Sequence, residues 1–177
     1  VDTEKAVGGD AQLELTADVD DALEDSVRAM WVSTFHSACV RILRAEATRL
    51  GIGTSFSIYD TQDSQRLMAM VCRDMDLDPK KFPPRTFNRA VSDLKNELID
   101  PLAAAAAASG RQEQLVAEAY GHYQRRLAAA NAMDFDDLIS QTVTLLQSHP
   151  DVRAKYRAKF RHVLVDEYQD TNHAQYV

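Results

Sequence analysis

The chain has 177 residues, of which 45% are hydrophobic and 27% charged, a composition that suits one packed domain with an insertion. No apolar run approaches the roughly 20 residues of a membrane-spanning helix, and no basic segment followed by an apolar core opens the chain. We therefore expect a cytoplasmic protein, and because the chain does not begin with Met, a piece of a longer one.

Charge is unevenly distributed along the chain. The net charge is −7, but residues 1–26 contain nine acidic side chains and one lysine, which leaves +1 on the remaining residues. Residues 1–29 are thus predicted to form an acidic leader, solvated and mobile. The negative net charge of the whole chain therefore does not exclude nucleic acid as a partner of the residues after this leader. Cys39 and Cys72 are interpreted as small buried hydrophobic residues in a reducing compartment.

In chain order, the pattern predicts two short strands with a block of helices between them. "MWVSTF" (30–35) mixes β-branched and aromatic residues and predicts a strand, followed by a helix that ends at Gly51. "FSIYD" (56–60) predicts a short extended segment. Apolar residues at steps of three and four predict further helices, starting near Asp60, Thr86, Leu115 and Asp134. His149–Pro150 is predicted to break the helix that starts near Asp134. A last helix (151–160) leads into a second strand, "HVLV" (162–165).

The two predicted strands are short and apolar, so they could be neighbours in one buried parallel sheet. The helical block would then be an insertion into an α/β domain. Asp166 and Glu167 directly follow the second strand, and ligand groups collect at the carboxyl ends of parallel strands. A solvated acidic turn also explains this pair. The longer pattern "DEYQD" favours a site where Asp166 holds magnesium and Glu167 polarises water.

Three motifs in order resemble those of superfamily 1 DNA helicases of the UvrD/Rep/PcrA type: "MWVSTFHSACVRILR" (30–44), "NAMDFDDLI" (131–139) and "FRHVLVDEYQDTN" (160–172). "DLKNELIDP" (93–101) and "YQRRLAAANA" (123–132) resemble the helical insertion of that family. The resemblance covers about residues 27–177. It implies an α/β, predominantly helical fold: a partial P-loop-type motor core with few parallel strands and an inserted helical subdomain.

The resemblance also implies a domain layout. Residues 30–50 would be the first motor-domain segment, strand and helix. Residues 51–130 would be the inserted helical subdomain. Residues 131–177 would return to the motor domain with the magnesium-binding strand.

Site residues follow from the matched motifs. Asp166 would bind magnesium together with the nucleotide, whereas Glu167 and Gln169 would be catalytic, with Gln169 near the γ-phosphate. Thr34, Phe35 and His36 would lie along single-stranded DNA. A site role or a structural role stays open for four residues of the "DFDDL" motif: Asp134, Phe135, Asp136 and Asp137.

The function implied by the resemblance is that of a fragment of an ATP-dependent DNA helicase. The intact protein would move 3′ to 5′ along single-stranded DNA, use ATP and Mg²⁺, meet a duplex junction and act with repair proteins, away from any membrane. The chain contains no Gly-Lys dipeptide, hence no GxxxxGK[ST] loop for phosphates. We therefore expect the isolated chain to bind no cofactor and to lack ATPase activity.

Other interpretations stay open. The chain could be a non-enzymatic helical module that binds DNA or a protein partner, or a metal-dependent nuclease that uses Asp166, Glu167 and Asp170. A basic region on the presumed insertion, "KKFPPR" (80–85) with Arg89 and Lys95, could contact duplex DNA. The basic stretch 153–161 is interpreted mainly as a solvated helix face.

Overall fold

The computed structural model describes residues 30–177, so the predicted acidic leader lies outside the described residues. The chain divides into two compact units, and the second, Thr34–Val177, contains all the regular structure described below. In the first unit, residues 30–33 adopt no helix or strand.

The predicted strand at 30–35 is wrong. Thr34 instead caps helix α2 (Phe35–Glu46), and its hydroxyl oxygen accepts a hydrogen bond from the Ser37 N–H at 3.3 Å. A short 3₁₀ helix, η1 (Ala47–Leu50), continues α2 and ends at Gly51, whose φ of 70° is left-handed. Local capping chemistry thus outweighs the β propensity of the preceding residues, because Thr at this position satisfies a free helix amide.

The one sheet within residues 30–177 has two short parallel strands, β1 (Ser57–Tyr59) and β2 (Ala132–Asp134), with Ile58 opposite Met133. β1 confirms the predicted extended segment, whereas β2 lies where the start of a helix was expected. The predicted sheet between 30–35 and 162–165 does not form: neither segment is a strand. A strand needs a neighbouring strand for its backbone groups, and within residues 30–177 the sheet consists of β1 and β2 and includes neither segment.

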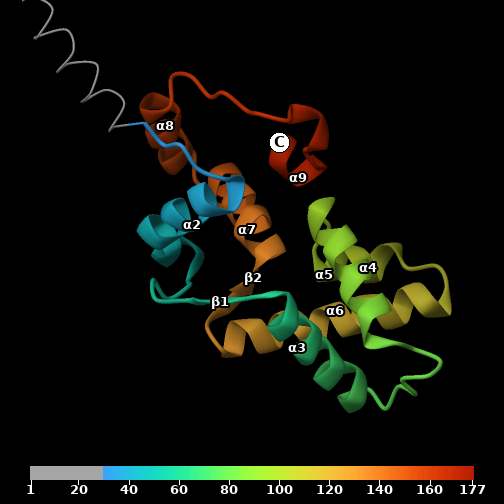
Figure 1. Ribbon diagram of the computed structural model, residues 1–177. Helices are drawn as coiled ribbons and strands as arrows, with labels where there is room; N and C mark the ends of the chain where they lie inside the picture. Colours follow the sequence, from blue (N-terminus) through green and yellow to red (C-terminus); the bar gives the residue numbers. More distant parts are fainter. Residues whose placement is uncertain (1–29) are drawn as a thin grey trace, which may run out of the picture. The chain divides into compact units, whose positions relative to one another are not determined.

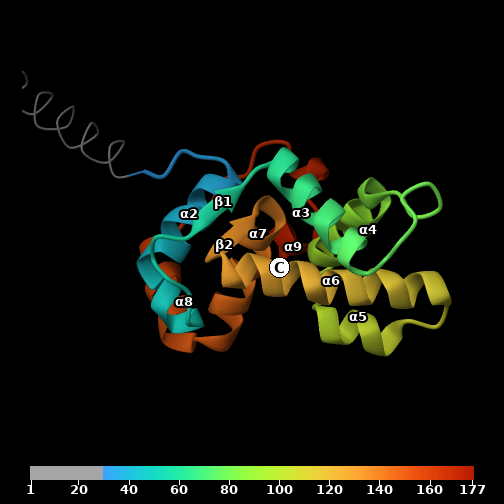
Figure 2. The same cartoon turned by 90° about the horizontal axis from the view of Figure 1, so that it is seen from below.

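Four helices pack together beside this sheet: α3 (Thr61–Asp74), α4 (Pro84–Asn96), α5 (Pro101–Ala107) and α6 (Arg111–Ala129). Figures 1 and 2 show them gathered on one side of β1 and β2. Their core includes Met68, Val71, Phe87 and Tyr123, each at most 3% exposed. The helix expected to start at Thr86 starts at Pro84 instead, since proline suits the first helical position.

On the other side of the strands, α2 packs against α7 (Phe135–Ser148), and α8 (Pro150–Lys159) follows after His149. The predicted break at His149–Pro150 is confirmed. Burial raises the pKa of both thiols, Cys39 and Cys72, in agreement with their interpretation as buried residues.

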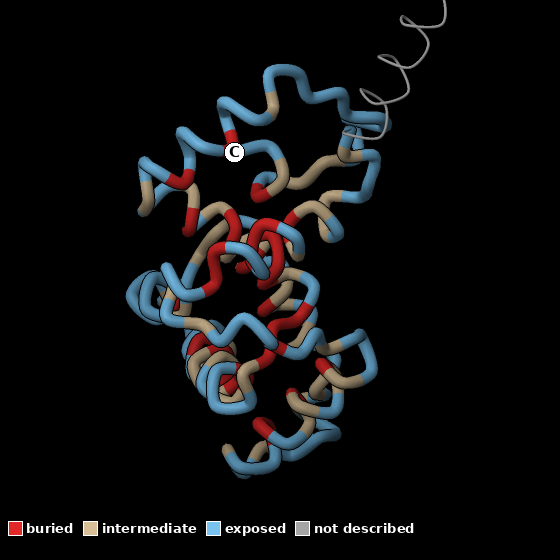
Figure 3. The backbone as a smooth tube through the Cα atoms, turned by 90° about the vertical axis from the view of Figure 1, so that its left-hand side faces the viewer, coloured by how far each residue is buried: buried red, intermediate tan, exposed pale blue. Residues whose placement is uncertain are grey.

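After α8 the chain runs exposed across the molecule. Residues 161–170 are all exposed, including Leu164 at 94%, and they contain only the 3₁₀ turn η2 (Tyr168–Asp170) before α9 (His173–Tyr176). Figure 3 shows this stretch near the C-terminus as an exposed tube. The predicted strand "HVLV" is therefore wrong, since residues 162–165 belong to no strand.

The fold is predominantly helical with a small parallel sheet, in agreement with the coarse α/β prediction. The proposed boundaries at 50 and 130 stay predictions. Within residues 30–177 there is no helix both long and apolar enough to span a bilayer.

Candidate functional site

The "TFH" motif lies at the amino-terminal end of α2. Thr34 is exposed and Phe35 and His36 are partly buried, so part of each aromatic side chain still faces solvent. The Thr34 hydroxyl caps the helix by accepting from the Ser37 N–H, and it also donates to the Ser37 hydroxyl at 3.1 Å. Its visible role is thus to start the helix that presents the two rings.

Two motifs that are 99 residues apart in sequence meet at His36 and Phe135. Their ring centroids are 5.7 Å apart with an interplanar angle of 79°, an edge-to-face contact. Phe135 is the first residue of α7 and is 45% exposed. The packing of α2 on α7 therefore creates a partly exposed aromatic pair, which we call the aromatic pair.

The acidic residues beside Phe135 form a buried ionic cluster. The Lys95 ammonium lies 2.7 Å from Asp134 Oδ2 and 2.9 Å from Asp137 Oδ1, and all three residues are at most 6% exposed. The Tyr123 hydroxyl donates to Asp134 at 2.9 Å and the Gln124 amide donates to Asp137 at 3.1 Å. We call these five residues the Lys95 cluster. It joins α4, α6, β2 and α7.

The two acids also cap α7 reciprocally. The Asp137 N–H donates to Asp134 Oδ1 at 2.9 Å, and the Asp134 N–H donates to Asp137 Oδ2 at 3.3 Å. This arrangement satisfies two amides at the start of the helix. Asp134 and Asp137 are therefore occupied by structural bonds, which leaves them no exposed carboxylate with which to contact a ligand.

Asp134 and Asp137 share the single cation Lys95, and their pKa values shift in opposite directions. Burial alone would raise the pKa of both carboxyls. Lys95 and the Tyr123 hydroxyl bring the pKa of Asp134 below its usual value, whereas burial and the Asp134 charge raise the pKa of Asp137 to about 6. The pKa of Lys95 is raised despite burial, because both carboxylates favour its charged form.

The remaining acid of the motif, Asp136, is only partly buried. Burial raises the pKa of Asp136, and the Ser92 side chain on α4 partly offsets this rise. Asp136 thus lies close enough to both Ser92 of α4 and His36 of the aromatic pair to interact with them.

The prediction that Lys95 belongs to a DNA-contacting basic region is wrong, since its side chain is 1% exposed. Lys80, Lys81, Arg85 and Arg89 are exposed, so the rest of that region stays available. The helical spacing indicates that Lys95 is buried, because it lies four and eight residues after Val91 and Phe87, which are both buried. Its two partners, 39 and 42 residues ahead, could not be identified from spacing.

Asp166, Glu167 and Gln169 are exposed, and only Tyr168 separates Glu167 from Gln169 in the sequence. Glu167 has a left-handed φ of 49°, its N–H donates to Asp166 Oδ1 at 3.0 Å, and its own carboxylate accepts from the Gln169 amide. The Thr171 hydroxyl donates to the Tyr168 carbonyl at 2.8 Å. The segment is therefore a tight turn that directs its polar groups to solvent.

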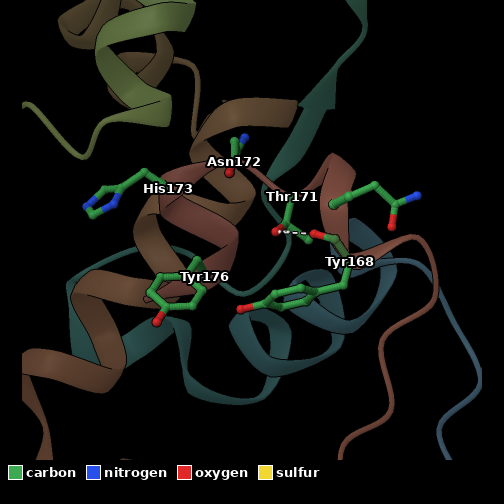
Figure 4. Close-up of a pocket in the computed structure, with 6 residues that line it drawn as sticks. Tyr168, Thr171, Asn172, His173 and Tyr176 are labelled. Carbon is green, nitrogen blue, oxygen red and sulfur yellow. Dashed lines mark hydrogen bonds between the residues drawn. The ribbon is translucent and has the colours of Figure 1, made fainter.

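An open depression of about 410 Å³ lies beside this turn. Gln169 and Thr171 line it together with residues of α9, and the rings of Tyr168 and Tyr176 lie 6.3 Å apart at its edge (Figure 4). Both tyrosines are more than half exposed. Within residues 30–177, no three histidine, cysteine or acidic side chains converge on a metal position, and Asp166, Glu167 and Asp170 are no exception.

Comparison with known proteins identifies the family. The family model for the UvrD/REP helicase N-terminal domain matches residues 7–177. The chain belongs to this family. The matched residues include the three motifs and the helical block.

Two relatives show how similar other members are. This UvrD/REP-type chain is 58% identical over 157 residues to the ATP-dependent DNA helicase UvrD1 of Mycobacterium tuberculosis, which is 86% of the chain and 20% of the relative. It is 45% identical over 166 residues to the ATP-dependent DNA helicase PcrA of Staphylococcus aureus, 94% of the chain and 23% of the relative. The chain therefore spans about a fifth of the length of these curated relatives.

The exposed residues suit part of a magnesium–nucleotide site. Mg²⁺ is usually held by one or two carboxylates and by phosphate oxygens, so the exposed Asp166 carboxylate is a fitting ligand. The sequence has no glycine-rich lysine loop to hold phosphates. The given sequence thus contains a carboxylate that suits Mg²⁺ and no loop of this kind.

Proposed function

We propose that this chain is part of an ATP-dependent DNA helicase and contributes two surfaces to it. One is the aromatic pair, which would contact single-stranded DNA. The other is the Asp166–Gln169 turn, which would contribute magnesium-binding and catalytic groups to a nucleotide site. The meeting of His36 with Phe135 is the observation that carries this proposal, because it joins two family motifs into one exposed feature.

The chemistry of the aromatic pair suits single-stranded DNA. Partly exposed rings offer faces on which bases stack without regard to sequence, and His36 adds a hydrogen-bonding group. Phe35 and Thr34 lie at the same helix end and would extend the contact. Asp134, Asp136 and Asp137 would support Phe135 rather than touch DNA.

At the nucleotide side, Asp166 would hold Mg²⁺, Glu167 would orient and polarise water, and Gln169 would sense the terminal phosphate. Bound Mg²⁺ would neutralise charge on the phosphates. The names of the relatives support an ATP-dependent DNA helicase and no more. Movement in the 3′ to 5′ direction, action at a duplex junction and a role in DNA repair with protein partners are parts of the proposal that rest on the family alone.

DNA binding by the aromatic pair is tested by Phe135→Ala and His36→Ala. Fluorescence anisotropy with a labelled single strand should show salt-dependent binding whose Kd rises roughly 5- to 100-fold in Phe135→Ala, since a stacked base contributes about 1–3 kcal/mol. Met70→Ala is the matched control, because Met70 is apolar and also 45% exposed. Equal binding by Phe135→Ala and Met70→Ala would refute the assignment of this surface.

A further inference from the structure

Three residues of α4 lie on one face of the helix near its end: Ser92, Lys95 and Asn96. Their spacing of three and four residues places their side chains next to one another. Two of them reach the 134–137 motif, and the third reaches the start of α9. Ser92 lies near Asp136 and lowers its pKa, Lys95 forms ion pairs with Asp134 and Asp137, and Asn96 accepts a hydrogen bond from Asn172 at 2.7 Å.

Asn172 holds α9 by its other polar atoms. Its Oδ1 accepts from the Gln175 N–H at 2.9 Å, and its own N–H donates to Gln175 Oε1 at 3.2 Å, which completes a capping box. The Asn172 amide nitrogen then donates to Asn96. Through this one side chain, the start of α9 is attached to the end of α4.

The attachment matters because the preceding chain packs little against the helices, apart from the contact of the Tyr168 ring with Tyr176 of α9. Residues 161–170 are all exposed, and Asn172, which is partly buried, and Ala174, at 3% exposure, are the next points where the chain meets the helices. Hydrogen bonds within 167–171 make the turn a unit: the Asp170 N–H donates to the Glu167 carbonyl at 2.9 Å and the Thr171 N–H to the Tyr168 carbonyl at 3.2 Å. A unit held at one end takes its position from that end.

We propose that Asn96 is a positioning residue for the Asp166–Gln169 turn and acts through Asn172. Because Lys95, its neighbour on α4, holds Asp134 and Asp137 on both sides of Phe135, the same helix face fixes both proposed surfaces relative to each other. Naming these surfaces as sites rests on the proposed function. The positioning itself rests on the contacts alone.

Hydrogen exchange of this chain, resolved along the sequence and measured without DNA or nucleotide, tests the proposal. Asn96→Leu removes the acceptor, and we expect amides in 168–176 to exchange roughly 5- to 10-fold faster while those of α6 are unchanged. Asn96→Asp keeps an acceptor oxygen and should restore the slow exchange. Asn88→Leu, on the same helix and also partly buried, is the matched control and should change nothing in 168–176.

Unchanged exchange at 168–176 in Asn96→Leu would overturn the proposal. So would equal acceleration in α6, because Asn96 would then act only on global stability, and so would a failure of Asn96→Asp to restore protection. Since the measurement contains no ligand, these outcomes are distinct from a failure of DNA binding in the anisotropy experiment.

Discussion

Among individual residues, the sharing of Lys95 between two buried carboxylates has the clearest energetic consequence. The cluster has one positive charge and two acids that are nearly inaccessible to water. A buried charge without a partner is unfavourable, so the less well compensated acid keeps its proton to a higher pH. Asp137 is that acid, with a pKa of about 6.

The raised pKa of Asp137 predicts a specific pH dependence of stability. In the unfolded chain the Asp137 carboxyl has a pKa of about 3.9. The stabilising contribution of Asp137 is therefore complete below this pKa and is lost as the pH rises through about 6. Asp134, whose pKa is lowered, stays ionised in both states above pH 5 and adds no slope there. From pH 7 to pH 5, the stability of the unmodified chain relative to Asp137→Asn should rise by about 1 kcal/mol.

Urea unfolding followed by circular dichroism at pH 5, 6 and 7 measures this difference. Asp93→Asn, an exposed acid on α4, is the control and should give no such trend. A pH-independent difference between the unmodified chain and Asp137→Asn would show that Asp137 is already ionised at pH 5.

For the secondary-structure elements, the ends of α3 and α4 share a motif. The Leu77 N–H donates to the Cys72 carbonyl and the Asp76 N–H to the Arg73 carbonyl, each at 3.0 Å. The end of α4 repeats this pattern with Leu98. Both Asp76 and Leu98 have left-handed φ values, 54° and 57°, at the position where glycine is usual. The hydrogen-bonded ends therefore contain local backbone strain.

Replacing Asp76 by glycine should stabilise the chain. Asp76 is exposed, so its side chain contributes little packing, and glycine adopts a left-handed φ without steric cost. We expect a gain of up to about 1 kcal/mol in the free energy of unfolding, reduced by the greater freedom of glycine in the unfolded chain. Thermal unfolding monitored by circular dichroism provides the measurement.

Asp78→Gly is the informative counterpart of Asp76→Gly. Asp78 has no left-handed φ, and its carboxylate accepts from the Lys80 N–H at 2.9 Å, so this change should destabilise the chain. If both glycine variants lowered the melting temperature, strain at Asp76 would not be the relevant quantity.

Across the whole of residues 34–177, a well-packed helical body contrasts with an exposed segment that contains Asp166 and Glu167, the acids of the proposed nucleotide site. The core of α3, α4 and α6 is almost inaccessible, whereas Val163 and Leu164 are 72% and 94% exposed. Acids on an exposed, unpaired segment lack the desolvated surroundings in which phosphoryl transfer is catalysed.

We predict that this chain by itself hydrolyses ATP negligibly, even with single-stranded DNA present. The acidic groups are there, but no glycine-rich loop and lysine hold the phosphates. Phosphate release measured with and without DNA should stay at the level of the Glu167→Gln variant. Robust turnover that Glu167→Gln abolishes, and the control Asp170→Asn retains, would contradict this prediction.

Local sequence was sufficient for most helices. Asp60 and Asp134 cap α3 and α7 as predicted, and the break at His149–Pro150 follows from proline geometry. These features depend on neighbours within a few residues, so residue type and spacing determine them. The order of the motifs was enough to identify the family.

Tertiary structure decided the strands, the buried lysine and the partners of each motif. "MWVSTF" and "HVLV" have strand-like composition, yet neither pairs, whereas Ser57–Tyr59 and Ala132–Asp134 do. From the sequence, Lys95 is predicted to be a surface cation, whereas in the structure it is buried against Asp134 and Asp137. The contact between His36 and Phe135 depends on the packing of α2 against α7, which the sequence does not reveal. Helix caps form between near neighbours, but pairing, burial and ion contacts depend on which distant segments meet.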